Sequence, residues 1–148
     1  EPYGRMNEMS WAPVYRAYGH NNRTLIARLP MSRRCLEVRQ ADSACNFYLG
    51  TAMVLAAGLE GVRDKLEPGE AVEYNTCDFS EEARAARGVE RVPRTFGQAL
   101  DAFESSDLAK IVFGDAFHAT YLKYKRAEWR EYCLDVSQWE RQKYLKLW

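Results

Sequence analysis

One stretch of the sequence, residues 44–66, limits the folds open to this chain more than any other. It predicts a helix that is apolar on nearly every side, with Phe47, Leu55 and Val62 among its large side chains. A helix without a polar face is usually buried. Its three glycines would each cost up to about 1 kcal/mol unless close packing requires them. We therefore expect this helix to be buried.

Short β-rich runs precede this helix. Residues 12–20 and 23–30 are separated by two asparagines. Asparagine tolerates positive φ angles, so this pattern predicts a β-hairpin. Residues 35–39 alternate in polarity and predict a further strand, with Glu37 and Arg39 on one of its faces.

Helices are predicted after the strands. Thr95 is a candidate N-cap for a short helix, and a longer helix can run from Ser106 to about Tyr132. Ser137 and Glu140 have the spacing of a capping box at the start of a last helix. A few antiparallel strands followed by helices indicate the α+β class.

Length, charge and cysteine content exclude several classes. The 148 residues are one domain's worth of chain, and 21 Lys and Arg balance 21 Asp and Glu. This balance does not indicate a nucleic-acid partner. The four cysteines include no C-x-x-C pair, which fits reduced thiols in a cytoplasmic protein better than disulfides or a zinc site. No uncharged span reaches 18 residues, so we expect no membrane helix.

The arginines are concentrated in the strand region. The first 64 residues contain eight arginines and no lysine. Arginine binds carboxylate or phosphate through a planar fork of donors, whereas lysine is a point charge. This bias predicts a pocket for phosphate and carboxylate oxygens. Arginine-rich codon usage together with ion pairs on the surface explains it equally well.

Glu37 is a second candidate feature. Its carboxylate, two residues before Arg39 on the same strand face, could ligate Mg²⁺ or Mn²⁺ while arginines hold phosphate oxygens. The alternative is an ion pair of Glu37 with Arg39 or with a residue on a neighbouring strand. Spacing alone leaves both open.

These residues also lie in longer motifs that resemble a known family. The stretches are "YGHNNRTLIARLP", "LEVRQADSACNFYLGTAMVLAAGLEGV" and "PGEAVEYN", and the chain ends in "SQWERQKYLKLW". In this order they resemble the carboxyl-terminal part of the glutamine synthetase superfamily. The resemblance covers essentially all 148 residues.

The resemblance implies a ligase that uses ATP and Mg²⁺ or Mn²⁺. ATP phosphorylates the γ-carboxylate of glutamate, and an amine then attacks the γ-glutamyl phosphate. Both steps build negative charge on oxygens, which fixed guanidinium groups and metal ions stabilise. The resemblance further implies a homo-oligomeric ring in the cytoplasm.

Three arginines correspond to residues that handle glutamate in the family. Arg5 matches the arginine that binds the carboxylate of glutamate. Arg23 matches one that contacts both glutamate and the transferring phosphoryl group. Arg39 matches the arginine near the γ-carboxylate. The resemblance therefore implies catalytic roles for Arg23 and Arg39.

Four residues correspond to the nucleotide and metal side of the family site. Arg28 matches an ATP-phosphate contact, and Glu37 matches a ligand of the metal that bridges the ATP phosphates. The link before Glu37 is shorter than in many members. We therefore expect either Arg33 or Arg34 to face ATP, and the alignment does not distinguish the two.

Trp11 departs from the family pattern. Ammonia-using bacterial members carry at this position a glutamate that accepts a proton from ammonium. Tryptophan cannot accept it, but its ring can contact an alkylammonium group, worth about 0.5–2 kcal/mol. We therefore favour an organic amine as the acceptor. In those members the glutamate lies in a flap that covers the site. If Trp11 merely packs this flap, an ammonia-dependent glutamine synthetase is the alternative.

The resemblance also predicts what this sequence lacks. Residues 1–148 correspond to a carboxyl-terminal fragment of the catalytic domain, without the amino-terminal β domain and the first part of the catalytic domain. We expect the fragment alone to be inactive. A non-catalytic assembly module is a further alternative, although a scaffold has no use for the full set of arginines and Glu37.

Overall fold

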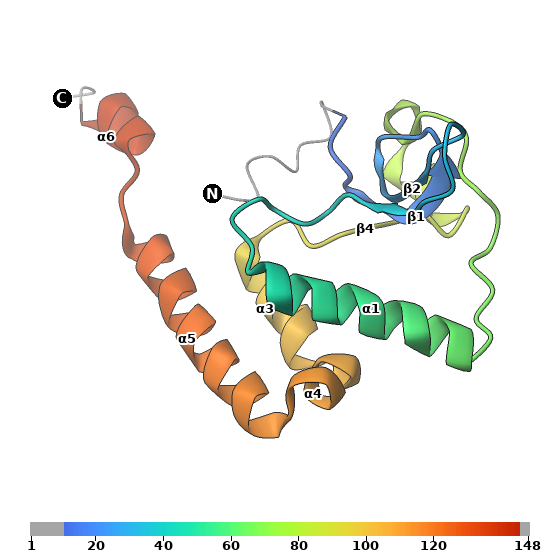
Figure 1. The fold of residues 1–148 in the computed structure, drawn as a ribbon. Helices are drawn as coiled ribbons and strands as arrows, with labels where there is room; N and C mark the ends of the chain where they lie inside the picture. Colours follow the sequence, from blue (N-terminus) through green and yellow to red (C-terminus); the bar gives the residue numbers. More distant parts are fainter. Residues whose placement is uncertain (1–10, 146–148) are drawn as a thin grey trace. The chain divides into compact units, whose positions relative to one another are not determined.

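The computed structural model of the protein describes residues 11–145. Its contacts divide the chain into two units, residues 1–95 and 96–148, and each is described by itself. Within the described residues, the strands lie in the first unit and the second is helical. The α+β class, with a helical carboxyl-terminal part, is confirmed (Figure 1).

The first unit contains a mixed four-stranded sheet with the order β3-β2-β1-β4. Its strands are β1 (Tyr15–His20), β2 (Leu25–Leu29), β3 (Glu37–Val38) and β4 (Glu90–Arg91). β1 and β2 are parallel, whereas β3 and β4 pair antiparallel with their neighbours. The two edges of the sheet are therefore the short strands β3 and β4.

The predicted hairpin between the first two strands is wrong. Tyr15 lies opposite Leu25 and His20 opposite Leu29, so residues 21–24 carry the chain back along β1. The expected positive φ is present at the first of the two asparagines, with a value of 57°. Alternation of polar and apolar residues identifies strands but not the direction in which they pair.

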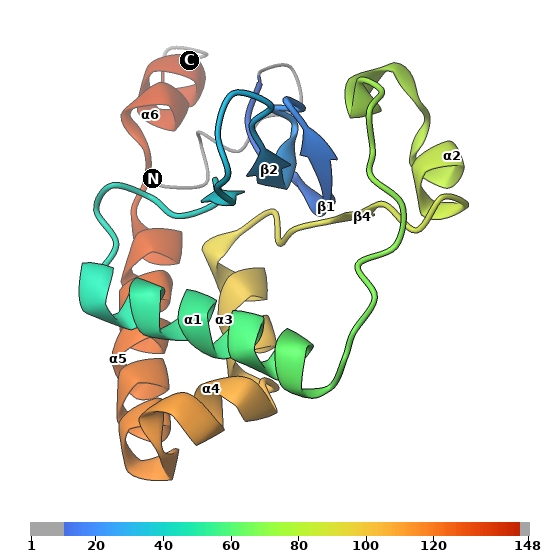
Figure 2. The ribbon, with the colours of Figure 1, turned by 45° about the vertical axis from the view of Figure 1, so that its right-hand side comes forward.

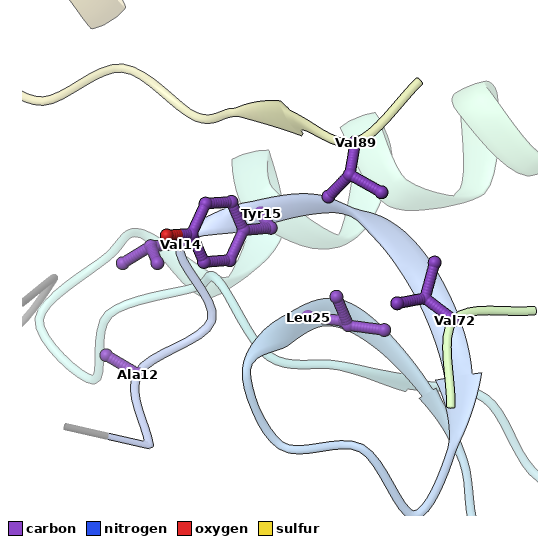
Figure 3. Close-up of a cluster of buried hydrophobic side chains, with 6 residues drawn as sticks. All are labelled: Ala12, Val14, Tyr15, Leu25, Val72 and Val89. Carbon is purple, nitrogen blue, oxygen red and sulfur yellow. The ribbon is translucent and has the colours of Figure 1, made fainter. Parts of the chain in front are cut away.

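Apolar side chains from distant parts of the first unit form its core, shown in Figure 3. Val14, Tyr15 and Leu25 are almost completely buried. A Cβ atom added to Gly19 would lie 2.3 Å from the carbonyl oxygen of Val72, so β1 needs glycine where that segment crosses it. The core thus ties β1 and β2 to residues far along the chain.

Helix α1 (Phe47–Arg63) forms as predicted, but its expected burial is wrong. Asn46 caps it by accepting hydrogen bonds from the next amides, and no residue of the helix is buried. Leu55 and Leu59 are 62% and 68% exposed. Nothing lies within 4 Å of a Cβ atom added to Gly58. The apolar pattern predicts a packing surface, and the residues described here do not cover it.

Two short helices follow α1 in the first unit, η2 (Thr76–Asp78) and α2 (Glu81–Ala85). The longer of the two is labelled in Figure 2. Their caps are Asn75 and Ser80, whose side chains accept hydrogen bonds from amides of the first turn. They connect the segment beside β1 to β4.

The second unit contains α3 (Phe96–Glu104), α4 (Asp107–Phe113), α5 (Asp115–Leu134) and α6 (Gln138–Tyr144). The single long helix expected from Ser106 is divided at Gly114, whose φ of 76° ends α4. Ser106 does begin a helix, because its side chain caps α4, and the predicted capping box of α6 is formed. The short helix expected after Thr95 is α3, which begins at Phe96.

Close packing joins α3 to α5. A Cβ atom added to Gly97 would lie 2.8 Å from Nε1 of Trp129. His118 on α5 is buried, stacks on Phe103 and has its Nε2 2.9 Å from that residue's carbonyl oxygen. None of the helices in residues 11–145 is long and apolar enough to span a membrane.

Candidate active site

Arg28 and Glu37 form the centre of the predicted site. They are direct partners in the antiparallel β2–β3 pair, and Arg28 Nη1 donates to Glu37 Oε2 over 3.0 Å. Both side chains are only 25% exposed. Cross-strand partners point to the same face of a sheet, so the pairing itself brings these two charges together.

Arg33 completes an ion-pair cluster around Glu37. Its Nη2 donates to the second carboxylate oxygen, Oε1, over 2.8 Å. The hydrogen bonds from Arg33 and Arg28 lower the pKa of the Glu37 carboxyl below its ordinary value. Glu37 is thus held as a carboxylate between two guanidinium groups, which are charge-assisted contacts.

The guanidinium of Arg28 is also fixed from its other side. Its Nη2 donates to Oδ1 of Asn21 over 3.1 Å. Its Nε is buried and has no hydrogen-bond partner among the described residues. An unsatisfied buried donor in a native fold calls for an explanation such as a ligand or an ion. An anion oxygen is the acceptor that a guanidinium prefers.

Arg39 does not pair with Glu37, although the two were predicted to share a strand face. Its amide donates to the carbonyl oxygen of Ile26 over 2.8 Å, and its Nη1 donates to the carbonyl oxygen of Arg23. β3 ends at Val38, so the alternation on which the prediction rested does not extend to Arg39. Arg39 instead holds the loop that carries Arg23.

Arg23 is exposed and lies in the loop before β2. It is therefore not on the strand that carries Arg28. The loop is fixed at both of its ends by Arg39 and by the buried hydroxyl network described below. The Arg23 side chain can reach a ligand from this loop while its main chain stays in place.

The remaining predicted residues do not join the cluster. Trp11 is 64% exposed and precedes β1. Arg34 is exposed in the link between β2 and β3. Arg5 lies outside the described residues. Within residues 11–145, the structure places Arg28, Arg33 and Glu37 together and Arg23 beside Arg39.

A polar network at the Arg23 loop was not anticipated. The Asn22 amide donates to the carbonyl oxygens of Val72 and Tyr74, both over 2.9 Å. Its Oδ1 accepts from the amide and the hydroxyl of Thr24. Thr76 donates to that hydroxyl over 2.7 Å, and both threonines are buried. Asn22 is the local sequence signal for this network, but a pair of asparagines between two strands predicts a hairpin instead.

One further pair lies at the end of β1. Glu73 Oε1 accepts from the amide of His20 over 3.1 Å and lies 2.7 Å from His20 Nδ1. The bonds to the main chain and side chain of His20 lower the pKa of the Glu73 carboxyl. Together with Asn22, this pair fixes residues 72–74 against the loop that follows β1.

The described residues contain no group of three or more His, Cys, Asp or Glu side chains that could hold a metal ion. Glu37 is the one predicted ligand. Magnesium is often held by one or two carboxylates together with phosphate oxygens and water. The cluster fits such a site as the source of a single ligand, because its carboxylate is kept ionised and Arg33, 66% exposed, can turn away.

The arrangement suits chemistry on anions. Two guanidinium groups flank a carboxylate, and one of them carries a buried donor without an acceptor. Preorganised charges of this kind stabilise charge that develops on oxygens without reorganising. The strand pairing, and not a loop, sets the geometry of Arg28 and Glu37.

Comparisons with known proteins place the chain in a family. The model of the glutamine synthetase catalytic domain matches residues 1–144. The chain is 39% identical over 137 residues to the glutamate–methylamine ligase of Methyloversatilis universalis, covering 93% of this chain and 30% of that protein. It is 37% identical over 139 residues to a glutamine synthetase of Methanosarcina mazei, covering 92% of this chain and 31% of that protein.

Solved structures show the same fold. A complex of GmaS with ADP matches with a TM-score of 0.75 at 33% identity, over 91% of this chain and 30% of that one. GmaS without ligand matches with a TM-score of 0.74 at 32% identity, over 97% of this chain and 32% of that one. The chain thus spans less than a third of the length of these relatives. It belongs to the glutamine synthetase catalytic-domain family.

Proposed function

We propose that this chain supplies part of the active site of an ATP-dependent ligase. The reaction joins the γ-carboxylate of glutamate to an amine through γ-glutamyl phosphate. The observation that carries the proposal is the Arg28–Glu37–Arg33 cluster, in a chain whose relatives include a glutamate–methylamine ligase. The acting protein is a cytoplasmic homo-oligomeric ring.

The cluster has a defined role in this proposal. Arg28 and Arg33 bind phosphate oxygens of ATP, and Glu37 contributes one ligand to Mg²⁺ or Mn²⁺, which neutralises phosphate charge when bound. The buried Nε of Arg28 is a donor available for an anion oxygen. Arg34, exposed beside Arg33, stays a candidate for the same phosphates.

Arg23 and Arg39 act on the glutamate side, together with Arg5. Arg39 Nη1 donates to the carbonyl oxygen of Arg23, so the Arg39 guanidinium lies against the loop that carries Arg23. From there they stabilise the negative charge that develops on the γ-carboxylate oxygens. Fixed donors are needed because the charge appears only during the reaction.

Trp11 selects the amine. Its exposed ring offers an alkylammonium group a cation–π contact and, for its alkyl part, an apolar contact that ammonium cannot make. An organic amine is therefore the preferred acceptor. Ammonia is the second candidate, because relatives of similar identity include glutamine synthetases.

A chimera tests this function. The matching segment of the Methyloversatilis ligase is replaced by this chain, and phosphate release is measured with glutamate, Mg·ATP and either ammonium or methylamine. We expect methylamine to be preferred and Trp11→Glu to shift the preference toward ammonium. Trp139→Glu, at another exposed tryptophan, is the matched control and should not shift it.

Two other outcomes would contradict the proposal. A preference for ammonium in the unsubstituted chimera would identify a glutamine synthetase. A folded, assembled chimera that releases no phosphate with any amine would identify a non-catalytic assembly module. The 148-residue chain alone is expected to release no phosphate above background.

A further inference from the structure

Two adjacent asparagines, Asn21 and Asn22, lie between β1 and β2 and bond to different parts of the chain. The side chain of Asn21 accepts from Arg28 on β2, whereas that of Asn22 donates to the main chain of a segment about fifty residues away. Arg28 belongs to the nucleotide side of the proposed site, and Arg23 belongs to its glutamate side. Each asparagine is therefore linked to one half of the site.

The backbone of Asn21 sets the position of its side chain. Its φ angle of 57° is in the left-handed region, which asparagine, aspartate and glycine tolerate. Its amide donates to the carbonyl oxygen of Leu29 over 3.3 Å, which ties this turn to the end of β2. Its Oδ1 accepts from Arg28 Nη2 over 3.1 Å and lies 3.5 Å from the amide nitrogen of Met31. A short side chain on a fixed backbone gives this acceptor a defined place.

Arg28 is consequently held from two sides by acceptors of different charge. Glu37 accepts from its Nη1 over 3.0 Å, and Asn21 accepts from its Nη2. A carboxylate offsets part of the positive charge of a guanidinium, whereas an amide oxygen is a neutral acceptor. Asn21 therefore orients one edge of the guanidinium and leaves its charge available to a phosphate.

Asn22 anchors the main chain on both sides of Arg23. Its Oδ1 accepts from the amide of Thr24 over 3.1 Å and from the hydroxyl of Thr24 over 2.8 Å, so these bonds span Arg23. The Thr24 hydroxyl accepts in turn from the buried hydroxyl of Thr76. Arg23 itself is exposed. The network thus fixes the neighbours of Arg23 and leaves its side chain at the surface.

Position matters more for such arginines than for ordinary surface charges. Donors that stabilise developing charge act without reorganising only when they are already in place. A displacement of about 1 Å in a catalytic site can lower the rate about 100-fold. The hydrogen bonds of the two asparagines are of the kind that maintains such positions.

We propose that Asn21 and Asn22 are positioning residues with separate roles. Asn21 orients Arg28 for the phosphates of ATP, and Asn22 holds the loop that presents Arg23 on the glutamate side. This inference rests on the proposed function. It requires a split between the kinetic constants for the two substrates, because a merely structural pair would affect both substrates alike.

Steady-state kinetics of the chimera with the Methyloversatilis ligase tests the role of Asn21. Asn21→Gly keeps the left-handed backbone and removes the acceptor. It should raise KM for Mg·ATP about tenfold, the usual effect of losing a hydrogen bond to a charged group. KM for glutamate should stay the same.

Asn22→Ala should give the reverse result in the same assay. It should lower kcat about tenfold and raise KM for glutamate, without changing KM for Mg·ATP. Thr76→Val removes the hydroxyl at the far end of the network and is the milder second variant, with changes in the same direction. Ser106→Ala, which removes the cap of α4 in the second unit, is the control and should change neither KM.

A measurement without turnover follows the two arginines directly in the 148-residue chain. NMR relaxation of the Nε–H group of Arg28 reports the mobility of its guanidinium, and amide hydrogen exchange reports opening of the Arg23 loop. Asn21→Gly should raise the mobility of Arg28 and leave exchange at residues 23–24 unchanged. Asn22→Ala should speed this exchange and leave the mobility of Arg28 unchanged.

The outcomes distinguish this inference from the proposed function. Equal changes of both KM values in Asn21→Gly and Asn22→Ala, or effects of the same size in Ser106→Ala, would overturn the inference. Unchanged mobility of Arg28 in Asn21→Gly would overturn it as well. A folded, assembled chimera that releases no phosphate would instead contradict the proposed function, and the NMR measurements would still decide whether the asparagines hold the two arginines.

Discussion

Arg28 on β2 and Glu37 on β3 are direct cross-strand partners, with Arg28 Nη1 3.0 Å from Glu37 Oε2. The ion pair that the spacing of these residues left open is therefore formed, across strands and not along one strand. The pair keeps Glu37 ionised, and a carboxylate must be ionised to ligate a metal. The ion pair thus prepares the carboxylate for the role that we propose.

Acid should weaken the folded state through Glu37. The folded-state pKa of its carboxyl is lowered below the ordinary value of 4.5 by Arg33 and Arg28. A carboxyl with a lowered folded-state pKa stabilises the folded state at every pH above its ordinary pKa. This stabilisation is lost as the pH falls through the folded-state pKa. When the pH falls below about 4.5, the Glu37→Gln variant should therefore lose less unfolding free energy than the unsubstituted chain loses.

Thermal unfolding between pH 6 and pH 3 measures this difference. Glu67→Gln, in the exposed turn after α1, is the control and should follow the unsubstituted chain. Parallel stability curves for the chain and for Glu37→Gln would show that the two arginines do not perturb Glu37 in solution.

Asn22 should contribute more to stability than its place in a surface loop suggests. Asn22→Ala removes two donors to main-chain carbonyls and the acceptor for Thr24, and should cost about 2–3 kcal/mol of unfolding free energy. Asn22→Asp keeps the acceptor and loses both donors. Urea unfolding of both variants separates the two halves of the network.

If Asn22→Asp is as stable as the unsubstituted chain, the bonds to Val72 and Tyr74 contribute nothing. Both variants should also loosen the Arg23 loop. Amide hydrogen exchange of residues 21–24 would then become faster, because this loop is held to residues 72–76 through Asn22 and the threonine hydroxyls.

Local patterns in the sequence located the elements but not their partners. Ser106 and the Ser137–Glu140 box mark helix starts through side-chain bonds to amides within the next three residues, so a short window contains all the information. The loop between the parallel strands β1 and β2 is held by hydrogen bonds from Asn22 to the carbonyl oxygens of Val72 and Tyr74, about fifty residues away. No periodicity encodes such a contact.

The candidate site was predictable to the same extent. The arginine bias pointed to the strand region, and Glu37 was correctly placed beside positive charge. Its partners could not be read from spacing, because the register of β2 against β3 places Arg28 opposite it and a turn brings Arg33 back. Arg39 lies one residue beyond the end of β3 and therefore turns to Arg23.

Alanine substitutions should distinguish Gly19, which is packed against main chain, from Gly58, which has open space beside it. Gly19→Ala would place its Cβ 2.3 Å from the carbonyl oxygen of Val72, so main chain must move, at a cost of about 2 kcal/mol or more. Gly58→Ala meets nothing within 4 Å inside α1 and should raise stability by about 0.5–1 kcal/mol. Chemical unfolding of both variants checks the two signs.

Two identical substitutions should test the exposure of α1. Leu25 is completely buried in the core, whereas Leu55 on α1 is 62% exposed. Leu25→Ala should therefore cost about 2–5 kcal/mol of unfolding free energy, and Leu55→Ala less than about 0.5 kcal/mol. Urea unfolding at several protein concentrations measures both. Costs of similar size would show that the apolar surface of α1 is covered in solution, and a concentration dependence would show that a second copy covers it.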